Sequence, residues 1–383
     1  MFVTGCQFLT LLGGIAVLHQ GKSKGEAKAR GLLQIFCLGV ELMQQKKQRA
    51  SFAVCPLKFF LIPVFTVCLF MQTVQGAEVQ ELIPAGKTVG VTLDTAGLLV
   101  LGTGSINGEG PIVSKKEIQA GDRILKADGK EVENKEVFQQ MIENSGGNPM
   151  TLLLERDGRQ KTVCVTPVFS AADNAYKIGI WVRDSIQGIG TLTFFDPKTK
   201  RFGALGHGVY DVDTGQLMTI REGALAKAEL TEIIKGEKGE AGELIGTVDL
   251  QTKIARVEQN TEAGIFGSIG SAFFEGTALQ VAKLEEIRKG DAVILSDLEG
   301  DGVKEYAIVI ENIRRNHGGN HKDLTIRITD ERLLGLTGGI VQGMSGSPII
   351  QDGKLVGAVT YVLVNDAAKG YGIFIGNMLD AAE

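Results

Sequence analysis

Glycine-containing turn signals occur at short intervals along this sequence, and their frequency limits the folds that the chain can adopt. Glycine occupies 51 of the 383 positions, whereas aromatic residues make up only 6%. Short apolar segments separated by pairs such as Asp-Gly and Asp-Pro are typical of strands joined by tight turns, and not of long packed helices. The sequence therefore predicts a mainly β protein.

The length and charge of the chain narrow the classes of protein to consider. A chain of 383 residues can hold two ordinary domains together with a leader segment. The formal net charge of -5 comes without a basic stripe. Because nucleic-acid binding needs such a stripe, nucleic acid is not an expected partner.

The cysteines and histidines have no metal-binding pattern. Four of the five cysteines lie within the first 68 residues and none forms a CxxC pair, so Cys164 is the only thiol expected in the folded part. The four histidines include no HExxH pair. A disulfide framework, structural zinc and a metalloprotease are therefore not expected, and the prediction includes no metal and no cofactor.

Residues 1–77 are predicted to be a leader that takes the chain to a membrane. The run 59–71 is uncharged and apolar, follows the basic residues Lys46, Lys47, Arg49 and Lys58, and precedes a polar stretch. This order indicates a signal sequence or an uncleaved anchor, and a buried core segment is the other interpretation. Residues 1–42 are either additional membrane-associated helices or the product of a misplaced translation start.

Residues 84–167 have the strand and helix order of a small peptide-binding module. Asn134 is a suitable N-cap for a helix extending to Asn144. The segments 151–155 and 160–165 flank Asp157-Gly158, which predicts a hairpin.

The string Gly121-Asp122-Arg123-Ile124-Leu125, followed by Asp128-Gly129-Lys130, resembles a PDZ domain. In PDZ domains a glycine-containing loop binds a peptide carboxylate through backbone N–H groups, and the adjacent sheet edge pairs with the peptide. The resemblance implies that Thr88, Val89, Gly90 and Val91 form this loop.

Residues 176–383 are predicted to form a second, larger β domain. Strand-like segments recur throughout it and turn signals separate them, which favours a sandwich or a barrel. The expected segments are 178–182, 190–195, 244–248, 307–310, 324–328, 348–351 and 355–361.

A serine between two glycines is the candidate nucleophile of this second domain. Ser345 lies in the string Gly343-Met344-Ser345-Gly346-Ser347-Pro348, and glycine neighbours allow the sharp turn that points N–H groups at a developing oxyanion. An ordinary Gly-Ser turn is the alternative interpretation, and Ser347 is a competing nucleophile.

Two further residues complete a candidate catalytic triad. His207, in the turn Gly206-His207-Gly208, is the preferred base, because His317 and His321 lie in a polar loop. Asp330 is the preferred carboxylate, at the end of a strand-like segment and fifteen residues before Ser345, with Asp211 and Asp213 as alternatives.

The chain also resembles the SpoIVB sporulation serine peptidases from about Leu82 to its end. The resemblance depends on the strings 190–197, 202–209, 339–350, 364–366 and 370–372. It implies a PDZ-like domain followed by a trypsin-like double β-barrel, and catalysis by His207, Asp330 and Ser345. By analogy with trypsin-like enzymes, the N–H groups of Gly343 and Ser345 would form the oxyanion hole. Met344 replaces the aspartate that precedes the nucleophile in digestive enzymes, so activation by an ion pair to a new N-terminus is not available.

The resemblance further implies a role in sporulation. The enzyme would reach the forespore membrane or intermembrane space and cleave its own N-terminal region. It would then cut a membrane protein that regulates an intramembrane metalloprotease, which leads to sigma-factor activation. The alternative from a different class is a non-catalytic PDZ-containing scaffold, which predicts that Ser345→Ala leaves function intact.

Overall fold

The computed structural model describes residues 80–383 apart from 112, 115, 271–275 and 316–320. The predicted leader, including the run 59–71, lies outside the described residues. Within the part that is described, no helix is long and apolar enough to cross a membrane.

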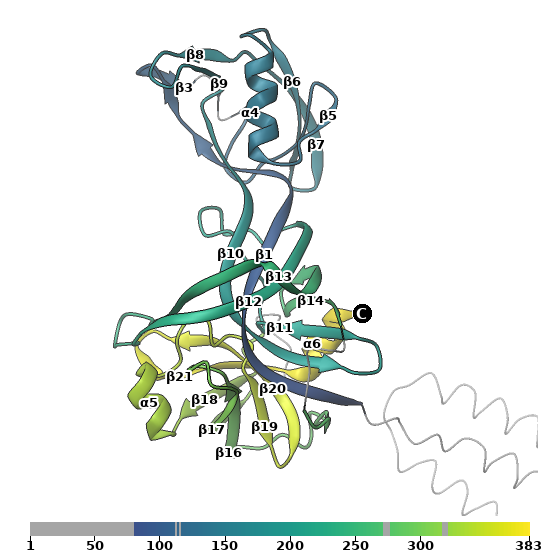
Figure 1. The fold of residues 1–383 in the computed structure, drawn as a ribbon, viewed down its shortest axis with the longest axis vertical. Helices are drawn as coiled ribbons and strands as arrows, with labels where there is room; N and C mark the ends of the chain where they lie inside the picture. The colour runs from purple at the N-terminus through teal and green to yellow at the C-terminus, as the bar shows by residue number, and fades with distance from the viewer. Residues whose placement is uncertain (1–79, 112, 115, 271–275, 316–320) are drawn as a thin grey trace, which may run out of the picture. The chain divides into compact units, whose positions relative to one another are not determined.

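Six strands form a closed ring of antiparallel pairs, which is the first barrel. The strand order is β10-β11-β14-β13-β12-β1, and β10 also pairs with β1 (Figure 1). Its buried side chains include Val91, Leu93, Phe202, Leu225 and Ile265. The strands are β1 (Glu81–Thr103), β10 (Ile180–Asp196), β11 (Arg201–Ala204), β12 (Ile220–Ile234), β13 (Glu243–Thr261) and β14 (Gly264–Ile269).

The second barrel is closed in the order β16-β17-β18-β21-β20-β19. Helix α5 (Glu331–Thr337) follows β18, and helix α6 (Ile375–Ala382) follows β21. The short strand β15 (Leu279–Gln280) pairs with the start of β1. The barrel strands are β16 (Gly290–Ser296), β17 (Lys304–Ile313), β18 (Leu324–Ile328), β19 (Pro348–Gln351), β20 (Lys354–Leu363) and β21 (Asp366–Phe374). Two closed barrels confirm the predicted double β-barrel architecture.

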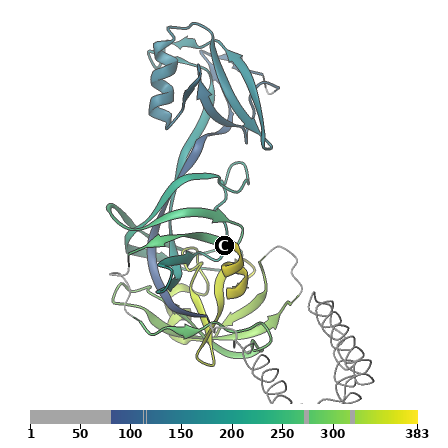
Figure 2. The same ribbon diagram turned by 90° about the vertical axis from the view of Figure 1, so that its right-hand side faces the viewer.

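Helix α4 (Lys135–Asn144) lies beside the strands of the PDZ-like module (Figure 2). The module has a separate core of buried side chains. The side chain of Asn134 caps α4 by accepting the N–H of Val137 at 2.8 Å, as the sequence predicts. Asp157 and Gly158 have positive φ angles of 49° and 71°, so they form the predicted hairpin turn. The other elements are β2 (Ser105–Ile106), β3 (Glu109–Pro111), β4 (Arg123–Ala127), β5 (Lys130–Glu131), β6 (Met150–Arg156), β7 (Arg159–Val165), β8 (Val168–Ser170) and β9 (Ala175–Lys177).

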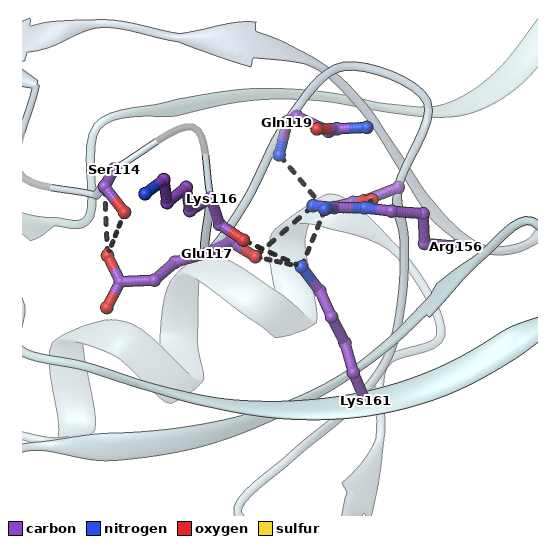
Figure 3. A network of polar contacts seen from close by, with 7 residues as sticks. Ser114, Lys116, Glu117, Gln119, Arg156 and Lys161 are labelled. Atoms are coloured by element: carbon purple, nitrogen blue, oxygen red, sulfur yellow. Dashed lines mark hydrogen bonds and ion pairs between the residues drawn. The ribbon is translucent and has the colours of Figure 1, made fainter.

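A buried carboxylate explains the string Gly121-Asp122-Arg123 at the entry to β4. Asp122 is completely buried, and it accepts hydrogen bonds from the N–H of Gln119 at 3.0 Å and from the guanidinium of Arg156 at 2.7 Å. The Nζ of Lys161 is 3.9 Å from the same carboxylate, and it also donates to the carbonyl of Glu117 (Figure 3). A buried charge is tolerated only with such partners, so this motif is structural in the module.

The predicted boundaries of the module need correction at both ends. Residues 84–97 were assigned to it, yet Val89, Val91 and Leu93 pack in the core of the first barrel. The module core instead begins at Leu98 and includes Ile178 and, partly buried, Val182. The reason is that β1 and β10 are long strands that run through both the barrel and the module. Ile83 pairs with Phe195 in the barrel, and Thr103 pairs with Ile180 in the module, so no loop marks the boundary.

Candidate active site

The turn that holds Ser345 is fixed by one apolar anchor and two glycines. The side chain of Met344 is completely buried in the core of the second barrel. Gly343 and Gly346 have φ angles of +97° and +98°, which favour glycine. A Cβ atom on Gly346 would lie only 2.1 Å from the carbonyl oxygen of Thr191, so this position must be glycine. Met344 thus holds the turn by packing, at the position where digestive enzymes use an aspartate.

The hydroxyl of Ser345 is half-buried and has a single partner in the described residues. Its Oγ donates to the carbonyl oxygen of Thr360 on β20 at 2.7 Å. Ser347 is completely buried, and its Oγ lies 3.5 Å from the Oγ of Ser296 in the core of the barrel. Of the two serines, only Ser345 lies where a substrate can reach it.

His207 follows β11 in the first barrel and is held on two sides. Its Nδ1 lies 2.8 Å from the carbonyl oxygen of Gly208, and its ring stacks on Tyr361 with centroids 5.0 Å apart. Burial lowers the pKa of His207 below its ordinary value, while the hydrogen bond to Gly208 partly offsets this effect. The imidazole is therefore neutral near pH 7, with Nδ1–H donated to Gly208 and Nε2 able to accept a proton.

One cavity of about 510 Å³ contains both His207 and Ser345. The two turns touch, since a Cβ on Gly346 would be 2.6 Å from the amide nitrogen of Leu205. The cavity is lined by Val91, Leu93, Ile186, Gly188, Ile189, Leu205, His207, Gly208, Val209, Tyr210, Ala241, Ile340, Val341, Gln342, Gly343, Ser345, Thr360, Tyr361, Val362 and Val364. The fold therefore brings together two of the three predicted triad residues from separate barrels.

Beside this cavity, the N–H groups of Gly343 and Ser345 have no hydrogen-bond acceptor within the described residues. Their turn is tied to the first barrel by Thr191 on β10. The Oγ1 of Thr191 donates to the carbonyl oxygen of Gly343 at 2.8 Å, and its N–H donates to the carbonyl oxygen of Ser345 at 3.0 Å. Unpaired N–H groups next to a hydroxyl are what stabilisation of an oxyanion requires.

The structure does not bring Asp330 to this cavity. Its carboxylate caps α5 by accepting the N–H groups of Arg332 and Leu333, and it forms an ion pair with the Arg332 guanidinium at 2.8 Å. It also accepts the N–H of Ala307 at 3.3 Å. The pKa of Asp330 falls to about 2, mainly because of the hydrogen bonds with Arg332. With these bonds made locally, none of its contacts reaches His207, whose Nδ1 uses Gly208 instead.

The predicted carboxylate-binding loop at Thr88, Val89, Gly90 and Val91 is wrong. These residues lie in the middle of β1, which pairs with β10 on one edge and with β12 on the other. Val89, Gly90 and Val91 are therefore paired on both edges and Thr88 on one edge, so the segment is a central strand and not a loop.

A different part of the PDZ-like module is hollowed. A cavity of about 980 Å³ lies between α4 and residues 177–182, and its lining includes Phe138, Gln139 and Trp181. The side chain of Trp181 is 69% exposed.

Comparison with known proteins decides the family. The family model described as SpoIVB peptidase S55 matches residues 174–379, which is more than half of the chain. The chain belongs to this family. It is a serine peptidase, and the matched region contains both His207 and Ser345.

Other similarities are local or distant. A putative zinc metalloprotease of Bartonella henselae is 33% identical over 73 residues, which is 19% of this chain and 20% of that protein, so the match spans about a fifth of its length. The PDZ domain of an SdrC-like protein from Listeria monocytogenes is 18% identical, with a TM-score of 0.20 over 23% of this chain and 87% of that domain. The active form of the Rv3671c protease from M. tuberculosis is 17% identical, with a TM-score of 0.32 over 51% of this chain and 73% of that one. The HtrA-type protease AlgW is 10% identical, with a TM-score of 0.33 over 78% of this chain and 64% of that one.

Three residues of the site were missed by sequence reasoning. The carbonyl oxygen of Thr360 accepts the hydrogen bond of the Ser345 hydroxyl, Tyr361 stacks on His207, and Thr191 holds the turn that contains Ser345. Thr360 and Tyr361 lie inside an expected strand, and Thr191 lies inside another. No local signal distinguishes them, because each acts on a residue far away in the sequence.

Proposed function

We propose that this serine peptidase is an endopeptidase in which Ser345 is the nucleophile and His207 the general base. The observation that carries the proposal is that these two side chains line one cavity, although 138 positions separate them in the chain. The low pKa of His207 favours the neutral form that a base needs, and the unpaired N–H groups of Gly343 and Ser345 suit an oxyanion.

The first half of the proposed reaction begins with rotation of the Ser345 hydroxyl from Thr360 towards Nε2 of His207. Oγ attacks the substrate carbonyl carbon as its proton moves to Nε2, and the carbonyl oxygen becomes an oxyanion held by the N–H groups of Gly343 and Ser345. The C–N bond then breaks as His207 returns the proton to the leaving amine. Water repeats the sequence on the acyl-enzyme and releases the acid.

In this mechanism Gly208 takes the place that a carboxylate occupies in a Ser-His-Asp triad. Its carbonyl oxygen accepts Nδ1–H, and this fixes the tautomer and the direction of the ring. The stacked Tyr361 ring restricts the same imidazole from its face.

The biological role that we propose follows the family. The enzyme is exported to the forespore membrane or intermembrane space by its N-terminal segment, with a single span or a cleaved signal. There it cleaves its own N-terminal region and a membrane protein that regulates an intramembrane metalloprotease, which triggers sigma-factor activation during sporulation.

Expression in a spore-forming host tests this role. The full chain is compared with Ser345→Ala by mapping the N-terminal fragments and by measuring sigma-factor-dependent reporter activity. Wild-type protein should release fragments from residues 1–80 and switch the reporter on, and the variant should do neither. A variant that keeps the reporter on would support the non-catalytic scaffold instead.

We also propose that the PDZ-like module recruits a peptide through the cavity between α4 and residues 177–182. The size of this cavity and the exposed Trp181 ring on its lining support the proposal. Trp181→Ala removes an exposed side chain, so it should weaken peptide capture while leaving cleavage of short peptides unchanged. Unaltered capture by this variant in a titration would exclude the cavity as the recruiting site.

A further inference from the structure

The lining of the catalytic cavity is almost entirely uncharged. Among its twenty residues there is no Asp, Glu, Lys or Arg, and the only titratable side chains are those of His207, Tyr210 and Tyr361. A charged substrate side chain inside it would lose its hydration without gaining an opposite charge, which is strongly unfavourable.

Hydrogen bonds around Ser345 fix which substrate residue enters this space. The residue that supplies the attacked carbonyl group is called here the acyl residue. Its carbonyl oxygen must reach the N–H groups of Gly343 and Ser345. Once the Ser345 hydroxyl turns to His207, the carbonyl oxygen of Thr360 is released and can accept the N–H of the same acyl residue. These two sets of hydrogen bonds place the side chain of the acyl residue between the segments 340–342 and 360–362, both of which line the cavity.

On the edge of β20 beside this space, residues 360–362 pair with no strand that the structure describes. Strand β20 pairs with β19 as far as Ala358, and Val359 forms hydrogen bonds with Gly346 and Ser347, whereas on the other edge the pairing with β21 continues to Leu363. An extended substrate can therefore add to residues 360–362 as a further strand, with the acyl residue at its end.

Ile340 lines the space that the acyl side chain would enter. Its side chain is only 2% exposed. A Cβ on Gly370 would meet the Cδ1 of Ile340 at 2.5 Å and the carbonyl oxygen of Tyr361 at 2.5 Å. The Ile340 side chain thus lies against β21, next to the backbone of β20, where a deeper pocket would have to open.

We propose that the peptidase selects a small aliphatic acyl residue, such as alanine or valine, and that Ile340 sets this limit together with Val362. The inference rests on the proposed function and adds the class of substrate to it. Larger apolar residues are disfavoured by the volume of Ile340, and charged residues by the uncharged lining.

The test uses the full chain in detergent and matched peptides that differ only at the acyl residue, with cleavage positions mapped by mass spectrometry. For the wild type we expect kcat/KM to be highest for Ala and Val, about tenfold lower for Leu and Phe, and at least about a hundredfold lower for Lys and Asp. Ile340→Ala should raise the ratio of kcat/KM for the Leu peptide to kcat/KM for the Ala peptide about tenfold.

Ile308→Ala is the matched control, because Ile308 belongs to the same core cluster as Ile340 but does not line the cavity. It should lower stability without changing the ratio. Val362→Ala, at a partly buried position, should also raise the Leu-to-Ala ratio if Ile340→Ala does not fold. The inference is overturned if the wild type prefers Lys, Asp or Phe. It is also overturned if the folded Ile340→Ala and Val362→Ala variants keep the wild-type ratio of kcat/KM for Leu to kcat/KM for Ala. Either result leaves the proposed function standing. Absence of any serine-dependent cleavage overturns the proposed function, and the inference with it.

Discussion

The hydroxyl of Ser345 donates to the carbonyl oxygen of Thr360 at 2.7 Å, while the ring of the adjacent Tyr361 stacks on His207. Neighbouring residues of β20 thus hold both members of the proposed catalytic pair. In the proposed mechanism the serine leaves Thr360 before His207 accepts its proton. In the proposed binding mode a substrate N–H group takes the same carbonyl oxygen, so substrate binding would itself favour this rotation.

The link between Thr191 and Gly343 can be tested with a matched pair of threonines on β10. Thr191→Val should lower kcat about tenfold and cost about 1–3 kcal/mol of stability, because the carbonyl of Gly343 loses its donor and the oxyanion turn is no longer pinned. Steady-state kinetics and urea unfolding measure both effects.

Thr193→Val is the control for that change. Thr193 is completely buried on the same strand, and its Oγ1 has no hydrogen-bond partner in the described residues. Its replacement should leave kcat unchanged and stability equal or higher. Equal losses in both variants would show that the Thr191 contact is not specific to catalysis.

The lowered pKa of His207 predicts an acid limb in the pH–rate profile. The midpoint of kcat/KM should lie below the ordinary histidine value of 6.5, since burial keeps the ring neutral. The unfolded chain binds this proton more readily than the folded chain, so stability should also fall as pH drops below about 6.5. The fall in stability that comes from His207 should vanish in His207→Gln. A kinetic midpoint above 7 would contradict the assignment.

The two interpretations of Asp330 give different results for Asp330→Asn. Asparagine still caps a helix, but it cannot form the ion pair with Arg332. The pKa of about 2 means that the charged carboxylate adds up to about 2 kcal/mol of stability at neutral pH, which is lost as pH falls from 3.8 through about 2. The stability gap between wild type and variant should therefore close in acid.

Activity at neutral pH separates a structural Asp330 from a catalytic one. From its place as the α5 cap, we expect Asp330→Asn to keep kcat within a few-fold when the protein is folded. A loss of about 10⁴ in kcat is the size expected for a triad carboxylate and would return Asp330 to that role.

Local signals account for the parts of the fold that sequence reasoning predicted. Asn134 caps its own helix and Asp157-Gly158 adopt positive φ angles, so both elements are encoded within a few residues. The expected strands 324–328 and 348–351 have the same bounds as β18 and β19. The second barrel, from β16 to β21, is built from such short strands.

The other parts of the fold and of the site depend on contacts between distant residues, which no local sequence pattern indicates. Most of the β12–β13 hairpin was missed because its outer residues are polar and exposed, and only pairing between the two strands defines it. Thr88–Val91 have the composition of a glycine-containing loop, yet strands on both sides make them a central strand. Asp330 ends a strand-like segment fifteen residues before Ser345, but Arg332 and the N-terminus of α5 occupy its carboxylate.

The most direct test of the central claim is labelling of the full chain with a serine-directed phosphonate, followed by peptide mapping. We expect a label on Ser345 that survives in Ser347→Ala, disappears in Ser345→Ala and is strongly reduced in His207→Ala. A label on Ser347, or no label on wild-type protein that cleaves peptides, would contradict it.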